Sequence, residues 1–149
     1  FRSANPVDPD VIADLMRNAA PAEWDAQKRR VYEDIQRLMI NRLDYSGMFE
    51  IMDGLEYNGL TLYSLAQAEN GEPVWSNIYI RNVEIRDNDI YVDPNLTDKV
   101  LIGEDAMSVF AYNFKDDCFE IRDKASTEFA IESHVNFSEM LSALIDTMN

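Results

Sequence analysis

The chain has 149 residues, 46% of them hydrophobic, and its 28 acidic and 13 basic residues give a net charge of −15. This length predicts one domain, spanning residues 1–149, and no apolar run approaches the roughly 20 residues that a membrane-spanning helix needs. Because a negative charge of this size repels phosphate backbones and anionic lipid headgroups, neither nucleic acid nor a membrane surface is expected as a direct ligand.

Residues 1–44 are predicted to be mainly helical. Asp8 supplies a capping side chain and Pro9 a favourable first helical residue, so the first helix is expected to run from here to near Pro21. A second pattern runs from Trp24 to Met39, with apolar residues on one stripe and charges around it. That distribution is typical of a half-buried helix.

A short helix and a tight hairpin are predicted next. Apolar spacing over residues 45–52 indicates a helical segment, and Gly54 stands just past its end, where a left-handed backbone is favoured. Asn58 and Gly59 readily adopt the two positive φ angles of a type I′ turn, so residues 55–63 are expected to fold back as a hairpin. We therefore interpret Gly54, Asn58 and Gly59 as residues that determine the fold.

The middle of the chain is harder to assign. Residues 66–73 are a polar connector that contains Asn70 and Gly71. Residues 75–89 follow neither the helical nor the strand period cleanly, so their secondary structure stays open.

The following segment predicts short strands joined by tight turns. Residues 99–102, 109–114 and 118–121 each have the composition of a buried strand, and 128–131 is a candidate edge strand. The polar step at residues 115–117 is the expected hairpin loop between the second and third of these strands.

The last predicted element is a C-terminal helix. Asn136 is its expected cap, Glu139 follows three residues later as in a capping box, and apolar residues from Phe137 to Met148 lie on one side. Helices at both ends with antiparallel strands between them predict a single α+β domain.

The sequence offers little for catalysis or metal binding. Cys118 is the only cysteine and His134 the only histidine, so neither a disulfide within the chain nor a zinc cluster can form. We interpret Cys118 as a strand residue and His134 as an ordinary residue before the last helix, although a Cys–His pair stays open. No phosphate-binding glycine motif is present, and we expect no cofactor. A lone cysteine fits a reducing compartment, and we expect a cytoplasmic protein.

One acidic stretch invites a calcium-loop interpretation. Asp87, Asp89, Asp93, Asn95 and Asp98 fall on ligand positions of such a loop. However, valine stands where the sharp turn needs glycine, tyrosine replaces a ligand, and the last ligand is the shorter aspartate. A solvated acidic loop is the better interpretation, and we expect no metal.

Negative charge is concentrated in the second half of the chain. Residues 1–64 contain 11 acidic and 7 basic residues, whereas residues 65–149 contain 17 and 6. Such a field attracts cationic partners and raises their encounter rate. The alternative is that the charge only maintains solubility.

Three stretches carry a resemblance to a known family. "MFEIMDGLEYNGLTLYSL", "LIGEDAMSVFAYNFKDDCFEIRD" and the helix opening "NFSEMLSALI" occur in an order and spacing that resemble the YrhA-like members of the SUKH superfamily. The resemblance covers roughly residues 45–148. Two features depart from it. Residues 1–44 show little of the sequence motif that usually precedes the hairpin in the family, and Asp53 stands where the family often has asparagine.

The resemblance implies an α+β fold and a function in binding. Bacterial members of this superfamily are held to be immunity proteins that bind and neutralise polymorphic toxins, often nucleases. For this chain it implies a binding protein without catalytic residues. Together with the negative charge, it predicts that the partner is a basic toxin domain, which the chain covers with its own acidic surface. Our candidates for partner contacts combine acidic residues with two aromatic anchors: Asp87, Asp89, Asp93, Glu104, Asp105, Asp116, Asp117, Trp75 and Tyr91.

Two alternatives remain at this point. The first is an interaction or regulatory scaffold of the same fold. The second is a hydrolase with paired carboxylates, which the abundance of acids permits but no motif supports.

Overall fold

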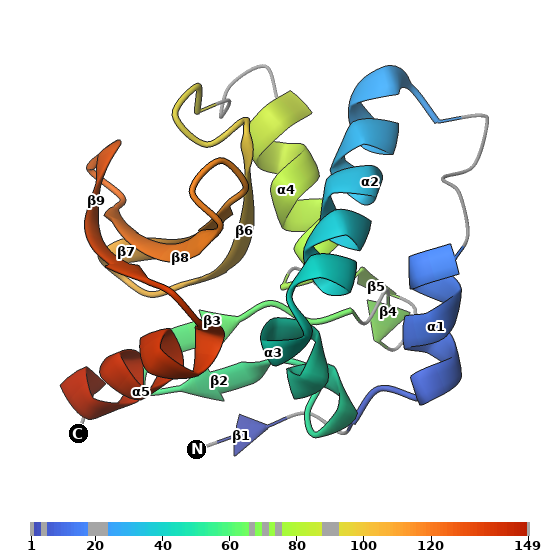
Figure 1. Cartoon of the computed structure of the whole chain (residues 1–149), viewed down its shortest axis with the longest axis horizontal. Helices are drawn as coiled ribbons and strands as arrows, with labels where there is room; N and C mark the ends of the chain where they lie inside the picture. Colours follow the sequence, from blue (N-terminus) through green and yellow to red (C-terminus); the bar gives the residue numbers. More distant parts are fainter. Residues whose placement is uncertain are drawn as a thin grey trace.

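A computed structural model of the chain describes residues 2–3, 6–17, 24–65, 68–69, 72–73, 76–87 and 93–148. Its main element is a sheet of seven strands in the order β1-β2-β3-β6-β7-β8-β9 (Figure 1). All neighbouring strands in this sheet are antiparallel. The strands are β1 (Arg2–Ser3), β2 (Leu55–Tyr57), β3 (Leu60–Leu62), β6 (Lys99–Glu104), β7 (Ser108–Asn113), β8 (Cys118–Asp123) and β9 (Ser126–His134).

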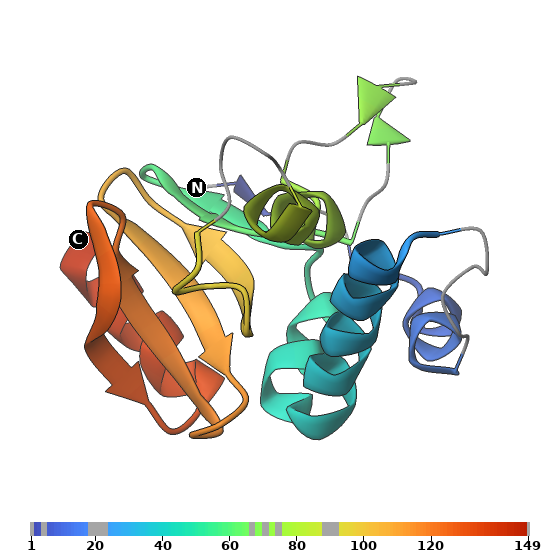
Figure 2. The same cartoon turned by 90° about the horizontal axis from the view of Figure 1, so that it is seen from above.

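The helices lie around this sheet (Figure 2). Helix α2 packs against α4 and β6, α1 packs against α2, and α5 packs against α3, β8 and β9. They are α1 (Pro9–Arg17), α2 (Ala26–Asn41), α3 (Leu43–Ser46) with the 3₁₀ turn η1 (Gly47–Glu50), α4 (Ile78–Asp87) and α5 (Phe137–Met148). The chain is thus a single α+β domain, as the sequence predicts.

The N-terminal helices begin close to their predicted starts. Helix α1 begins at Pro9 and is described as far as Arg17, so its predicted end near Pro21 lies outside the described residues, and α2 begins at Ala26, after Asp25. The Asp25 side chain caps α2 by accepting a hydrogen bond from the Lys28 N–H at 2.9 Å. No helix in the described ranges has the length and apolar character needed to cross a bilayer.

The β2–β3 hairpin has the predicted turn. Asn58 and Gly59 have φ angles of +48° and +85°, the two positive values of a type I′ turn. Gly54 has φ +87°, and a Cβ at this position would lie 2.6 Å from the Leu62 carbonyl oxygen. The hairpin prediction is confirmed, and Gly54 meets two constraints at once, a left-handed backbone and a close backbone contact.

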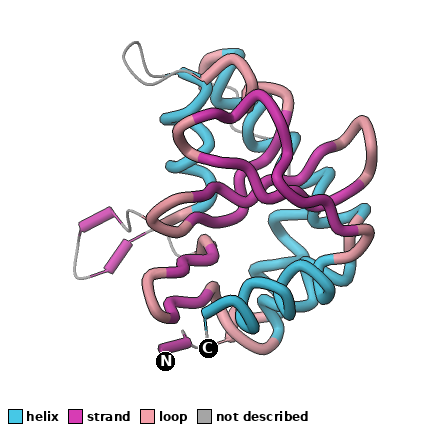
Figure 3. The backbone as a smooth tube through the Cα atoms, turned by 90° about the vertical axis from the view of Figure 1, so that its left-hand side faces the viewer, coloured by secondary structure: helices cyan, strands magenta, loops and turns pink. Residues whose placement is uncertain are grey.

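Strand β3 is followed by an excursion from the sheet. It contains a two-stranded ladder, β4 (Ala68–Glu69) with β5 (Glu72–Pro73), within the segment predicted as a connector. The tube in Figure 3 shows this ladder standing away from the main sheet. Two main-chain hydrogen bonds close the base of the excursion, from Ser64 N–H to the Ser76 oxygen and from Ile78 N–H to the Ser64 oxygen, each 2.9 Å.

The segment that the sequence left open contains helix α4. Its inward face is formed by Ile78, Asn82 and Arg86, spaced four residues apart. The Asn82 side chain donates to the Leu101 carbonyl and accepts from the Leu101 N–H, and Arg86 donates to the Lys99 carbonyl. Two polar side chains therefore occupy the buried face and seal the edge of β6 that β3 leaves unpaired, and this is why no apolar helical period was visible.

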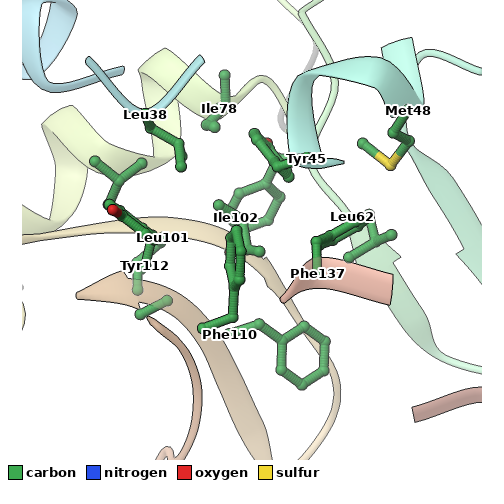
Figure 4. Close-up of a cluster of buried hydrophobic side chains, with 14 of the residues drawn as sticks. Leu38, Tyr45, Met48, Leu62, Ile78, Leu101, Ile102, Phe110, Tyr112 and Phe137 are labelled. Atoms are coloured by element: carbon green, nitrogen blue, oxygen red, sulfur yellow. The ribbon is translucent and has the colours of Figure 1, made fainter. Parts of the chain in front are cut away.

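The core lies between the sheet and α2, α3 and α5, and Figure 4 shows part of it. Its largest side chains are aromatic. Tyr45 of α3 meets Phe137 of α5 edge-on at 5.2 Å and Phe49 of η1 at 5.6 Å between ring centroids. Phe119 of β8 lies 5.6 Å from Phe137. This cluster joins the closing helix to the sheet.

We expect Gly54→Ala to lower the free energy of unfolding by about 3 kcal/mol or more, because an alanine there adds backbone strain and a clash with the Leu62 carbonyl. Urea unfolding followed by circular dichroism measures this change. Gly47→Ala is the matched control, since Gly47 has an ordinary helical φ of −60° and an added Cβ would meet nothing within 4 Å. Equal losses for both variants would contradict the assigned role of Gly54.

Candidate functional site

The predicted partner-binding acids lie at both ends of the sheet rather than in one patch. Glu104 and Asp105 stand where β6 turns into β7, and Asp116 and Asp117 stand where β7 turns into β8. Strand β7 lies between the two turns, and its length separates them by roughly 17 Å. The structure thus groups these four residues as two pairs.

At the first end, the carboxylates bind groups of the chain itself. Glu104 accepts hydrogen bonds from the Tyr63 hydroxyl at 2.7 Å, Lys124 at 2.7 Å and Arg81 at 3.1 Å. Asp105 accepts from the backbone N–H groups of Met107 and Ser108 and shapes the turn. Both residues therefore have structural partners, and Lys124 adds positive charge at this end.

Burial opposes ionisation of Glu104, but the hydrogen bonds from Lys124 and Tyr63 and the charge of Arg81 outweigh it. The pKa of Glu104 is therefore lowered from its ordinary value of 4.5. Burial and the neighbouring Glu104 carboxylate together raise the pKa of Tyr63, despite Arg81. Glu104 is thus an ionised acceptor at neutral pH, and Tyr63 is a neutral donor.

The opposite end of the sheet exposes its acids. Asp116 and Asp117 are both solvent-exposed, and Asp117 has φ +50°, a left-handed value. The Tyr112 hydroxyl donates a short hydrogen bond to the Asp117 carboxylate. Burial, followed by this carboxylate, raises the pKa of Tyr112 to about 12. The loop is therefore accessible to a partner, and the hydrogen bond from Tyr112 stabilises its conformation.

Arg42, between α2 and α3, fixes this loop. Its guanidinium donates to both Asp44 carboxylate oxygens at 3.1 and 2.9 Å. It also donates to the Asp117 carbonyl and carboxylate, both at 3.1 Å, and to the Val135 carbonyl at 2.7 Å. The same group lies over the Phe119 ring at 4.8 Å. One side chain thus joins the helical part, the β7–β8 loop and the start of α5.

Asp44 extends this connection to the C-terminal helix. Its carboxylate accepts a hydrogen bond from the Phe137 N–H at 2.8 Å, at the first residue of α5. The Asn136 side chain caps the same helix as predicted, accepting from the Glu139 N–H. Burial opposes ionisation of Asp44, but Arg42 and the Phe137 N–H outweigh it and lower its pKa.

The remaining predicted residues lie elsewhere. The Asp93 carboxylate accepts hydrogen bonds from the Thr127 hydroxyl at 2.7 Å and the Asn95 N–H at 3.0 Å. Asp87 is the last residue of α4. Asp89, Tyr91 and Trp75 lie outside the described residues. The aromatic anchors thus stay predictions.

A buried polar row on one face of the sheet was not predicted. Glu120 of β8 accepts from Arg122 at 2.9 Å and from Asn113 of β7 at 3.3 Å, and Arg122 donates to the Thr127 carbonyl at 2.7 Å. Lys99 lies on the same face and binds Asp98 at 2.9 Å. Strict alternation of Phe119, Glu120, Ile121 and Arg122 was the signal available in the sequence.

Cys118 and His134 do not form a pair in the structure. Cys118 is adjacent in its strand to Phe119, which opposes His134, so the Cys118 and His134 side chains point to opposite faces of the sheet. Burial and the nearby Glu120 and Asp116 raise the pKa of the Cys118 thiol, which makes it a poor nucleophile. Within the described ranges, no group of three or more metal-binding side chains occurs.

A separate groove of about 510 Å³ lies between α1, α2 and the start of α4. Its walls are mainly apolar, and Trp24 stacks on Tyr79 there at 5.1 Å between ring centroids. Burial raises the pKa of Tyr32 in the same wall.

Similarity to known proteins is limited. A stretch of 88 residues, 59% of the chain, is 34% identical to the uncharacterized protein YrhA of Escherichia coli strain K12. The matched region spans 62% of that protein. No protein-family model matches the chain, and no solved structure matches it.

We expect Arg42→Ala to lower the free energy of unfolding by roughly 2–3 kcal/mol, since it leaves Asp44 and the Val135 carbonyl without their main donor. Arg42→Lys keeps the charge but loses the two-pronged geometry, so a loss of about 1–2 kcal/mol is expected. Denaturant unfolding measures both. Arg17→Ala is the control, because Arg17 forms one exposed pair with Asp14 and its loss should change stability by less than about 0.5 kcal/mol.

Comparison of the wild type with Glu104→Gln should give a pH-dependent difference in stability. Because the folded-state pKa of Glu104 is lowered, the wild type's advantage is complete well above pH 4.5 and is lost as the pH falls below 4.5 and through the lowered folded value. Urea unfolding of both proteins between pH 7 and pH 3 measures the difference. A difference that grows toward acid pH would contradict the ion-pair assignment.

Proposed function

We propose that this chain is a non-catalytic binding protein that holds a basic protein domain against its negatively charged surface. More specifically, we propose that it is an immunity protein of the SUKH superfamily that neutralises a cognate bacterial toxin, with a nuclease as the favoured kind of toxin. The proposal combines the surface charge described below with the sequence resemblance, and the similarity to YrhA agrees with the YrhA-like part of that resemblance.

The observation that carries the proposal is the inward placement of the positive charges. Of the six basic residues in 65–149, three have side chains at most 10% exposed: Arg86, Arg122 and Lys99. Arg81 and Lys124 are paired with Glu104. Exposed acids in the same region include Asp98, Asp116, Asp117, Glu128, Glu132, Glu139 and Asp146. The sixth basic residue, Lys115, is exposed beside Asp116. On the exposed surface of this region, acidic residues thus outnumber basic ones.

Such a surface suits a basic partner. Long-range attraction raises the association rate, and carboxylates can occupy the positions where a nuclease binds phosphate groups. The loop with Asp116 and Asp117 is an exposed acidic feature whose conformation is stabilised by hydrogen bonds from Arg42 and Tyr112 to Asp117. Preorganisation of this kind reduces the entropy lost on binding.

The alternative scaffold function shares this surface but needs no toxin. It is favoured if the chain binds a basic protein that has no toxic activity. A hydrolase has less support, because the carboxylates of Glu104, Asp105 and Asp93 are each occupied by donors of the chain itself.

The proposal predicts that the chain binds the toxin domain encoded beside its gene and rescues cells that express it. The association rate, measured by stopped-flow fluorescence, should fall steeply as salt is raised from 50 to about 500 mM. Asp116→Lys should slow association more than Glu33→Lys, a control that makes the same charge change at an exposed position of α2. Rescue by none of the adjacent toxins, or an association rate independent of salt, would contradict the proposal.

A further inference from the structure

Strand β9 forms one edge of the sheet. It is the last strand in the order and pairs only with β8 among the described strands. Figures 1 and 2 place it at the free side of the sheet, away from α1 and α2. At nine residues it is the longest of the described strands, so its outer edge offers an extended stretch of main-chain donors and acceptors.

This edge strand carries exposed apolar side chains that the core does not use. Phe129 is 75% exposed and Ile131 is 58% exposed. By contrast, β7 and β8 each bury at least four of their six residues. Large apolar groups on a free edge favour association with another strand, and soluble proteins usually avoid them there.

Acidic residues flank the apolar pair. Glu128 and Glu132 are both exposed, and they stand one residue before Phe129 and one residue after Ile131. The His134 Nε2 lies 3.6 Å from the Glu132 carboxylate. The edge thus combines apolar contact area with exposed negative charge.

A second copy of this chain fits the edge poorly. Antiparallel pairing of two β9 strands centred on Ala130 would place Glu128 of each copy opposite Glu132 of the other, and like charges in that position are destabilising. Each copy also carries a net charge of −15. The pairing of β9 with β8 shifts register on both sides of Ala130, at Ile131 and over residues 127–129. A single extended segment can follow such a bent edge more readily than the sheet of a second copy can, because bulges disfavour flat edge-to-edge pairing.

We propose that the free edge of β9 binds an extended segment of a basic protein, with alternating basic and apolar side chains, as an additional strand. Main-chain hydrogen bonds would supply affinity, while lysine or arginine opposite Glu128 and Glu132 and apolar side chains against Phe129 and Ile131 would supply specificity. The inference rests on the proposed function in that it names a surface through which a basic partner is held.

The test uses the full chain and three acetylated, amidated peptides. Lys-Val repeated four times is the probe, and Glu-Val repeated four times reverses the charge. The Lys-Pro peptide, Lys-Pro-Pro repeated four times, keeps the four positive charges but lacks a regular row of N–H groups on either edge. Amide chemical shifts and hydrogen exchange followed by NMR locate binding. We expect the Lys-Val peptide to shift and protect amides of residues 126–134 and to bind about tenfold more tightly than either control peptide.

Variants separate the edge from general charge attraction. Phe129→Ser with Ile131→Ser should weaken binding of the Lys-Val peptide about tenfold. The matched control is Ile51→Ser with Met107→Ser, which removes two side chains of similar exposure, 74% and 71%, and should leave binding unchanged. Equal binding of the Lys-Pro peptide, amide shifts outside β9, or equal effects of both double variants would overturn the inference. A wild-type dimer abolished by the Phe129 and Ile131 changes would also overturn it, since β9 would then bind a second copy.

The two proposals fail separately. If a basic toxin domain binds the wild type with a steep salt dependence, and the Phe129→Ser, Ile131→Ser variant binds it equally well, the edge inference is wrong and the proposed function stands. If the Lys-Val peptide pairs with β9 but no toxin domain is neutralised, the edge inference stands and the immunity function is wrong.

Discussion

The contacts of Arg42 connect parts of the fold that are otherwise separate. This residue ends α2 and precedes α3, and its backbone also belongs to both helix ends, donating to the Leu38 carbonyl and accepting from the Tyr45 and Ser46 N–H groups. Its side chain reaches residues 75 and 93 positions away in the sequence, Asp117 and Val135. Arginine suits this position because its planar group offers five donors in fixed directions, whereas lysine offers a single charged point.

The same principle, polar side chains that complete a backbone network, governs the junction between α4 and the sheet. Asn82 and Arg86 satisfy main-chain groups of β6 that no strand can reach, and Arg86 also binds Asp34 of α2 at 2.6 Å. Burial of a charged pair contributes little net stability but makes alternative packings costly, because a displaced partner leaves an unpaired charge. These contacts therefore help to fix the positions of α2 and α4 on the sheet, beside the apolar packing of both helices.

Local signals made much of the fold predictable. The type I′ turn at Asn58 and Gly59, the left-handed Gly54 and the cap at Asn136 each depend on a few neighbouring residues, and each prediction agrees with the structure. Helix α4 was not predictable from hydropathy, since Asn82 and Arg86 face inward. Strand β9 extends well beyond the predicted 128–131, because its exposed pattern contains no alternation that marks its ends.

The candidate site was less predictable than the fold. Acidic residues close in sequence, such as Glu104 and Asp116, lie at opposite ends of β7, and only the chain path decides which of them point to solvent. The connection from Arg42 to Asp117 and Val135 spans distances in sequence over which no periodic pattern operates. Composition indicated the sign of the net surface charge. Which carboxylates are exposed and unpaired is decided by the folded structure.

The main-chain closure at Ser64, Ser76 and Ile78 has a practical meaning for engineering and for evolution. The chain leaves the domain at Ser64 and re-enters it at Ser76, and these two residues are hydrogen-bonded to each other. The excursion between Ser64 and Ser76 can therefore change in length without shifting the register of β3 or the start of α4. Lengthening such a closed loop costs only about 0.6 kcal/mol for each doubling. A reporter peptide or a fluorescent protein spliced into this excursion would therefore leave both ends of the sheet accessible to a partner.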